Sequence, residues 1–464
     1  MKLFKLKLTT LKSKLYAIVF ASFIVRFIGF FLLPSEPTVA LAPDEGGYAE
    51  IVRLVASEQP TTSYGGLYFI SRTLVLPAAV LNNLGIEPLS SVRIIASMYG
   101  VLTLILVAFL IIQFVNRHST YSELTFKRSN LIIGLFFVFA FLPSHLLWSM
   151  LGLRESPMEF WVLCSLAAIF LAVNLQEKVT LPIALLLTIS ITLLFNTRPQ
   201  VGWLLMVTIL VSPIFSNKRQ VSFTLALLTL IASGVGYASV VVQKQDVFAL
   251  VATDGSATDG SATDGSATDG SACQDSNQII IIKEKEYKCI KTGTRRDLSD
   301  LQNPGEIVVN ETIAIPIRHK GNQVAAASAI QTLSCPVTEE SQTDKYFCLV
   351  WRAPYMAATF LFRPLIGIDT TSTSSFIAAI ENIAWLGAIV FIAIMVIRKR
   401  RLAFIGPLAP SFIFFMLYCV GAGSYEGNMG TAFRHKSLIL WVILLLLASV
   451  IVAEKRPNSR NDSA

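Results

Sequence analysis

Ten apolar runs, each about as long as a bilayer is thick, constrain this chain more than any other feature of its sequence. They begin near Leu15, Val92, Asn130, Met158, Leu181, Val201, Val221, Ser375, Leu402 and Ser437. The pattern predicts an all-α polytopic membrane protein with about ten transmembrane helices. The composition agrees, since 53% of the residues are hydrophobic and 15% are charged, against about 25% charged in an ordinary soluble domain. We therefore exclude a soluble enzyme, a disordered scaffold and a nucleic-acid-binding protein.

The net charge of +8 is explained by topology. Basic residues fall in alternate loops, and such loops face the cytoplasm. The residues are Lys2, Lys5, Lys7, Lys12, Lys14, Arg117, Lys127, Arg128, Lys178, Lys218, Arg219, Arg398 to Arg401, Lys455, Arg456 and Arg460. We expect a multi-pass protein of the cell (inner) membrane, with both termini in the cytoplasm and its longest loop on the extracytoplasmic side.

The segment 67–84 is the ambiguous part of this topology. It is apolar enough to enter the membrane, but Arg72 and Pro77 interrupt it. If it spanned, every later loop would change sides and the longest loop would face the cytosol. A cytosolic location would conflict with the four cysteines of that loop, which suit disulfides in an oxidising compartment. We therefore interpret the segment as a re-entrant or interfacial helix.

Three regions follow from this pattern: an N-terminal membrane bundle (1–242) with a first outer loop (34–91), an extracytoplasmic loop (243–352), and C-terminal membrane helices (353–464). The long loop opens with four copies of ATDGS over 252–271, which predict a flexible linker. Runs rich in β-branched residues follow, so we expect a small β-containing module. Four cysteines suit two disulfides there: Cys273, Cys289, Cys335 and Cys348. Pairing Cys273 with Cys289 and Cys335 with Cys348 is the simplest of three connectivities.

Ionisable residues at membrane depth need a partner or a function, because burying a charge there is costly. Arg26 lies in the middle of the first run, and Glu159 and Glu381 are candidate partners. At the outer surface, Asp44 and Glu45 open the first outer loop just after Pro43. They are either an ordinary acidic helix start or part of a functional site.

A first membrane helix with a basic tail, followed by an outward Asp44-Glu45 pair and a series of spans, resembles the GT-C glycosyltransferases. Within them it is most similar to the group of protein O-mannosyltransferases and lipid A aminoarabinose transferases. The resemblance implies a sugar donor carried on a polyprenyl phosphate, with Asp44 as the general base and Glu45 assisting it. Segments around Trp148 to Phe160, Trp351 to Pro364, Glu381 to Trp385 and Gly427 to Lys436 are similar to segments of bacterial envelope-polysaccharide proteins.

This chemistry requires positive groups beside the departing lipid phosphate, and arginine offers a bidentate donor fork. By the predicted topology the outward ends of spans carry Arg154, Arg198, Arg363, Arg434 and His435. Each has a plainer interpretation, such as a loop ion pair or an interfacial anchor. The hypothesis predicts that they meet Asp44 and Glu45 at one place on the outer lipid boundary.

The sequence indicates no certain cofactor, and we predict no structural metal because the four histidines have no metal-ligand spacing. A divalent cation at Asp44 and Glu45 stays open as an alternative. The expected partners are a polyprenyl-phosphate-linked sugar, a glycan, lipid or protein acceptor, and the bilayer. Two other functions stay open: an O-antigen-type polysaccharide polymerase, and a transporter or flippase of lipid-linked sugars.

Overall fold

The computed structural model describes residues 2–33, 43–58, 71–118, 126–176, 178–215, 219–254, 279–282, 285–291, 307–309, 312–316, 351, 353–355, 357–366, 373–399, 408–425 and 429–452. Helices make up most of this part of the chain. In the N-terminal half they are α1 (Lys2–Leu32), α2 (Pro43–Ala56), α4 (Arg72–Asn83), α5 (Pro88–His118), α6 (Phe126–Phe141), α7 (Pro143–Met150), α8 (Glu155–Phe170), η3 (Leu171–Gln176), α9 (Leu181–Phe195), α10 (Pro199–Phe215) and α11 (Arg219–Asp254). Three long helices follow near the C-terminus: α14 (Thr373–Lys399), α15 (Ala409–Tyr425) and α16 (Met429–Val452).

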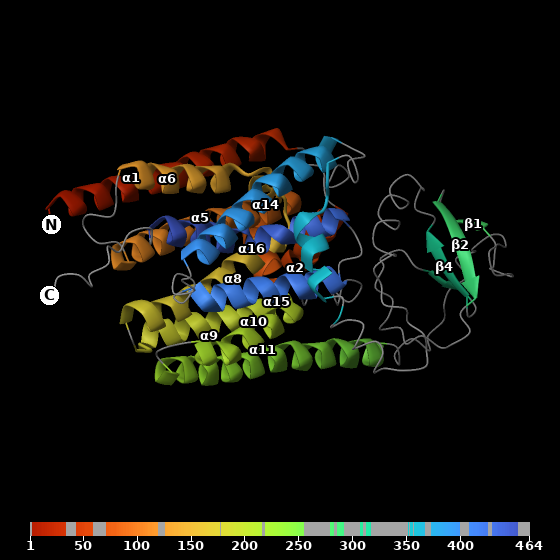
Figure 1. The fold of residues 1–464 in the computed structure, drawn as a ribbon. Helices are drawn as coiled ribbons and strands as arrows, with labels where there is room; N and C mark the ends of the chain where they lie inside the picture. Colours follow the sequence, from red (N-terminus) through yellow and green to blue (C-terminus); the bar gives the residue numbers. More distant parts are fainter. Residues whose placement is uncertain are drawn as a thin grey trace, which may run out of the picture.

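A helix lies at each of the ten predicted apolar runs, and the long helices run side by side in one bundle (Figure 1). Six helices in the described part of the chain are long and apolar enough to cross a membrane, and the bent pair α6 and α7 makes a seventh. The prediction of a multi-pass helical membrane protein is therefore confirmed. Helices α9, α10 and α15 have 15, 17 and 17 residues. At about 1.5 Å per residue they fall short of a hydrocarbon core of about 30 Å, so a count of ten spans stays a prediction.

Helix α16 forms the centre of the bundle. The apolar window of its span, Phe433–Val452, is entirely buried, and the helix contacts α5, α6, α8, α14 and α15. Peripheral helices differ, since 28% of the apolar window in α1 and 11% of that in α14 are buried. Because α16 is apolar on all sides from Leu438 onward, this part can pack against neighbours in every direction.

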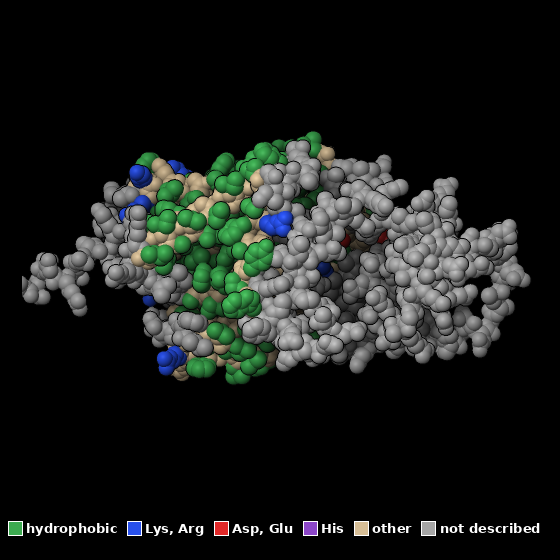
Figure 2. Space-filling model, turned by 45° about the vertical axis from the view of Figure 1, so that its right-hand side comes forward, with side chains coloured by type: hydrophobic (Ala, Val, Ile, Leu, Met, Phe, Trp, Pro, Cys, Tyr) green, Lys and Arg blue, Asp and Glu red, His purple; other side chains and the backbone are tan. Residues whose placement is uncertain are grey.

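Exposed hydrophobic side chains cover the face of the bundle drawn in Figure 2, with Lys and Arg side chains at its left-hand end and others towards the opposite end. A soluble protein rarely exposes so large an apolar surface, whereas lipid tails would cover it. The start of α1 carries Lys12 and Lys14 at the left-hand end. Helix α2 lies at the opposite end of the bundle (Figure 1).

The ambiguous segment 67–84 contains α4, which packs on α2 and α5. Twelve residues give a helix of about 18 Å, too short to cross the bilayer. Gly85 ends the helix in the left-handed region (φ 91°), where its N–H donates to the carbonyl of Asn82 at 2.9 Å. The interpretation of an interfacial or re-entrant helix agrees with this length.

The loop region contributes four short strands: β1 (Ile279–Ile282), β2 (Lys285–Lys291), β3 (Ile307–Val309) and β4 (Thr312–Pro316). They pair antiparallel in the order β1-β2-β4-β3. Cys289 lies in β2, but its side chain and Cys273, Cys335 and Cys348 are outside the described residues, so the disulfides stay a prediction. Cys164 and Cys419 are free, buried thiols within helices.

Candidate functional site

Asp44 and Glu45 occupy the first turn of α2, where Pro43 begins the helix. Proline is favoured at this position because its fixed φ suits a helix and no N–H is lost, and the positive end of the helix dipole favours carboxylates. The two side chains have opposite environments. Asp44 is 45% exposed, whereas the Glu45 side chain is fully buried.

Asp44 meets residues from distant parts of the chain. Its Oδ2 accepts a hydrogen bond from Arg434 Nη2 on α16 at 3.0 Å. Arg434 Nε lies 3.0 Å from Oε1 of Glu155, the first residue of α8. The same carboxylate oxygen lies 3.2 Å from Nε2 of His435. Arg198, just before α10, places Nη1 2.6 Å from that ring nitrogen. We call Asp44, Arg154, Glu155, Arg198, Arg434 and His435 the ionic cluster.

Arg154 belongs to the ionic cluster through its charge interactions. Its Nε and Nη1 are buried and have no hydrogen-bond partner among the described residues. Burial alone lowers the pKa of Arg154, but interactions with Tyr48, Glu155 and Asp44 outweigh it and hold the pKa above its usual value. Burial also raises the pKa of Tyr48 to about 12, so the phenol is neutral at physiological pH. The cluster thus contains three arginines and two carboxylates.

The Glu45 side chain points into the protein, whereas that of Asp44 is partly exposed. Arg93 of α5 donates to both carboxylate oxygens, from Nε at 2.5 Å and from Nη2 at 3.0 Å. The backbone N–H of Gly152, in the turn before α8, donates to Oε1 at 3.0 Å. Glu45 and Arg93 are both essentially unexposed. We call these three residues the buried clamp, because they join α2, α5 and the turn that leads to Arg154.

Arg363 is held near the ionic cluster by its backbone. Lys436 Nζ donates to the Arg363 carbonyl and, at 3.1 Å, to Asn382 Oδ1 of α14. Asn382 Nδ2 donates to the Pro364 carbonyl at 3.1 Å. Lys436 directly follows His435, so this segment packs against the part of α16 that carries the cluster.

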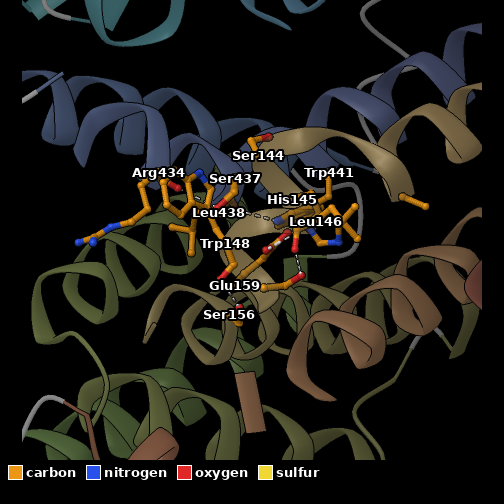
Figure 3. Close-up of polar contacts among 12 residues, drawn as sticks. Ser144, His145, Leu146, Trp148, Ser156, Glu159, Arg434, Ser437, Leu438 and Trp441 are labelled. Atoms are coloured by element: carbon orange, nitrogen blue, oxygen red, sulfur yellow. Dashed lines mark hydrogen bonds and ion pairs between the residues drawn. The ribbon is translucent and has the colours of Figure 1, made fainter. Parts of the chain in front are cut away.

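A second buried polar group lies one turn deeper on α8. Glu159 Oε2 is 3.6 Å from His145 Nδ1 of α7, and Figure 3 shows these side chains facing each other while Arg434 points away. Glu159 also interacts electrostatically with Arg26. Arg26 Nε donates to Ser149 Oγ at 2.9 Å, and its Nη1 donates to Ser22. Of the two candidate partners, Glu159 is thus the carboxylate whose charge acts on Arg26, while the hydrogen bonds of Arg26 go to Ser149 and Ser22.

Glu381, the other candidate partner of Arg26, forms its hydrogen bonds with Ser144 and Trp385. It accepts hydrogen bonds from the backbone N–H of Ser144 at 3.2 Å and from the Ser144 hydroxyl. The indole of Trp385 donates to it at 3.2 Å. The carboxylate thus caps the start of α7, which bends 43° from α6 at the break before Pro143.

Within the described residues, no three of His, Cys, Asp and Glu gather as metal ligands. Glu45 uses both oxygens for Arg93 and Gly152, so in this arrangement it does not share a cation with Asp44.

The structure brings together five of the predicted site residues: Asp44, Arg154, Arg198, Arg434 and His435. Sequence reasoning missed the central place of Glu155 and the whole of Arg93. Arg93 carries a usable signal, because it lies in an otherwise apolar helix that must give a buried charge a partner.

No family model, curated protein or solved structure matches this chain.

Proposed function

We propose that the protein is a membrane glycosyltransferase of the GT-C type, which moves a sugar from a polyprenyl-phosphate donor to an acceptor at the outer face of the cell membrane. The observation that carries the proposal is the ion pair between Asp44 and Arg434, which are 390 residues apart, with Glu155, Arg198 and His435 in contact around it. A half-exposed carboxylate and several arginines at one end of a membrane bundle match what such a reaction needs.

Asp44 is the proposed general base. Its exposed carboxylate removes the proton from the acceptor hydroxyl while that oxygen bonds to the anomeric carbon. The bond between this carbon and the phosphate oxygen breaks, and the lipid phosphate leaves with the electron pair. A single displacement inverts the anomeric configuration. Arg434 donates a hydrogen bond to Asp44 and so helps to fix the position of this carboxylate.

Charge supports an anionic donor. Arg154, Arg198 and Arg434 outnumber Asp44 and Glu155 by one positive charge. Glu155 is buried and the Arg434 side chain is 13% exposed, so water screens the interaction between these two groups less than it would at the surface. The buried Nε and Nη1 of Arg154 have no hydrogen-bond partner among the described residues, so both could donate to oxygens of a phosphate. Arg363 stays a further candidate, because Lys436 holds its backbone beside this part of α16.

Glu45 is assigned a positioning role in this proposal. Its neighbour in sequence is the proposed base, and Gly152, which it holds, precedes Arg154 by two residues. The buried clamp therefore fixes both the base and a donor-binding arginine relative to α5.

Substitution of Asp44 with Asn tests the proposal. It keeps the size and most hydrogen bonds but removes the basic oxygen, so we expect transfer from membrane-extracted lipid-linked sugars to fall by about 10²-fold or more. Glu50→Gln is the matched control, because Glu50 lies on the same helix in an exposed pair with Arg53. Both variants should purify as folded protein.

Full transfer activity in Asp44→Asn would overturn the assignment and favour the polymerase, which needs outward arginines but no early acidic pair. Movement of a labelled lipid-linked sugar between the leaflets of a liposome, without covalent transfer, would instead favour the flippase.

A further inference from the structure

His435 presents one ring nitrogen to two partners of opposite hydrogen-bonding character. Its Nε2 lies 2.6 Å from Arg198 Nη1 and 3.2 Å from Glu155 Oε1. A guanidinium only donates hydrogen bonds and a carboxylate only accepts them. Nε2 accepts from Arg198 when it carries no proton, and donates to Glu155 when it does. The two bonds therefore exclude each other.

The described arrangement has the geometry of the first alternative. Arg198 and His435 form a hydrogen bond, whereas both Glu155 oxygens are buried without one and have only ion-pair contacts. A buried carboxylate without hydrogen bonds is costly. A protonated His435 would supply the missing donor.

An anion would favour the second alternative. Arg154 has two buried N–H groups without a hydrogen-bond partner among the described residues, and Arg198 contacts the ring of His435. A phosphate oxygen is a better acceptor for Arg198 than a neutral imidazole, since both members of the pair are then charged. Once Arg198 turns to the phosphate, Nε2 is available to bind a proton and donate to Glu155.

We propose that the ionic cluster binds a phosphodiester anion together with one proton, which His435 takes up. The ligand rests on the proposed function, because the donor of such a transferase is a sugar phosphodiester. The proton comes from water and turns the imidazole of His435 into an imidazolium, and no covalent bond to the ligand changes. The negative charge of the anion offsets the added positive charge.

Charged and titratable groups lie on α16 and on the helices that pack against it. On α8 they are Glu155 and, one turn deeper, Glu159, with Arg154 at the helix start. On α16 itself they are Arg434 and Lys436. Asp44 and Tyr48 of α2 act through Arg434 and Arg154, while Arg93 of α5 is paired with Glu45. Helix α7 contributes His145, α14 contributes Glu381, α15 contributes Tyr418 and Cys419, and the charged residues of α6, Lys127 and Arg128, lie at the opposite end.

The test measures the Kd of a fluorescent farnesyl phosphodiester for the full-length protein in detergent, between pH 5.5 and 8.5. A phosphodiester keeps one negative charge over this range, unlike a phosphate monoester, which titrates near pH 6. Any pH dependence therefore comes from the protein. Since the bound state holds one more proton, the Kd should rise with pH, by up to about tenfold per pH unit.

Two variants and one control locate the proton. His435→Gln and Glu155→Gln should flatten the dependence of Kd on pH, the first by removing the titrating group and the second by removing its charged acceptor. His145→Gln makes the same change at a buried histidine outside the cluster and should keep the wild-type slope. Thermal unfolding of each protein checks that it is folded.

A wild-type Kd that does not change with pH, an unchanged slope in both variants, or no binding at any pH would each overturn the inference. The proposed function fails on a different result, full transfer by Asp44→Asn, so the two can be judged apart.

Discussion

Two neighbouring carboxylates of this protein lie in different environments, because one faces water and the other does not. Asp44 is 45% exposed and contacts Arg434, whereas Glu45 is fully buried between Arg93 and Gly152. Successive residues of a helix point about 100° apart, so one adjacent pair can serve two environments. The sequence alone presents them as a single acidic motif.

The buried clamp makes a prediction about stability. Glu45→Gln leaves the Arg93 guanidinium buried without its counter-charge, and breaking a buried pair costs about 3 to 5 kcal/mol. The exposed pair of Glu50 and Arg53 is worth at most about 1 kcal/mol, so Glu50→Gln should be nearly neutral. Thermal unfolding in detergent followed by tryptophan fluorescence compares the two. Equal losses of stability in the two variants would contradict a stabilising role of the buried pair of Glu45 and Arg93.

At the scale of elements, close helix packing places Arg26 inside the bundle. A Cβ on Gly100 of α5 would lie 2.5 Å from Cβ of Ser149 and 3.3 Å from Nε of Arg26. The absence of a side chain at Gly100 therefore lets α5 approach the hydrogen bond between these two residues.

Gly100→Ala should consequently destabilise the protein by about 1 to 3 kcal/mol, the usual cost of overpacking. Gly134→Ala on α6 is the control, because its Cβ would meet nothing within 4 Å. Alanine is a better helix former than glycine, so this variant should be neutral or slightly stabilised. The midpoint of unfolding distinguishes them, and a Gly100→Ala protein as stable as Gly134→Ala would contradict the packing argument.

The sequence predicted the elements better than their arrangement. Apolar length alone locates the helices, since lipid requires it. It does not separate lipid-facing helices from central ones: the spans of α14 and α16 have the same mean hydropathy of 2.3, but one is 11% and the other 100% buried. Lipid tails and neighbouring side chains are equally apolar, so the two positions leave the same signal.

Part of the site was predictable for a related reason. Asp44, Arg154, Arg198, Arg434 and His435 share one predicted end of the bundle, and a charge near a span end is conspicuous. Which groups form pairs depends on helix rotation, which the sequence does not specify. For that reason Glu155 and the partner of Glu45 were found only in the structure.

For the whole molecule, the topology makes a prediction that labelling can check. Ser57 follows α2 and Lys178 precedes α9, both are exposed, and the positive-inside rule places them on opposite sides. In a background without the loop cysteines, Ser57→Cys in intact cells should react with a membrane-impermeant maleimide. Lys178→Cys should react only after permeabilisation, while Cys164 and Cys419 are buried and should stay unlabelled. The reverse labelling pattern would invert the topology.

The ion pair between Asp44 and Arg434 also bears on biosynthesis. Asp44 leaves the ribosome early in synthesis, whereas Arg434 follows 390 residues later, on the last helix described. A nascent chain can place α2 at the membrane surface early, but Asp44 must wait for its counter-ion until α16 has been inserted through the centre of the bundle. In chains that terminate early, Asp44 would lack Arg434 as its counter-ion. Such chains would also lack the helix around which the others pack, so we expect membrane quality control to recognise them.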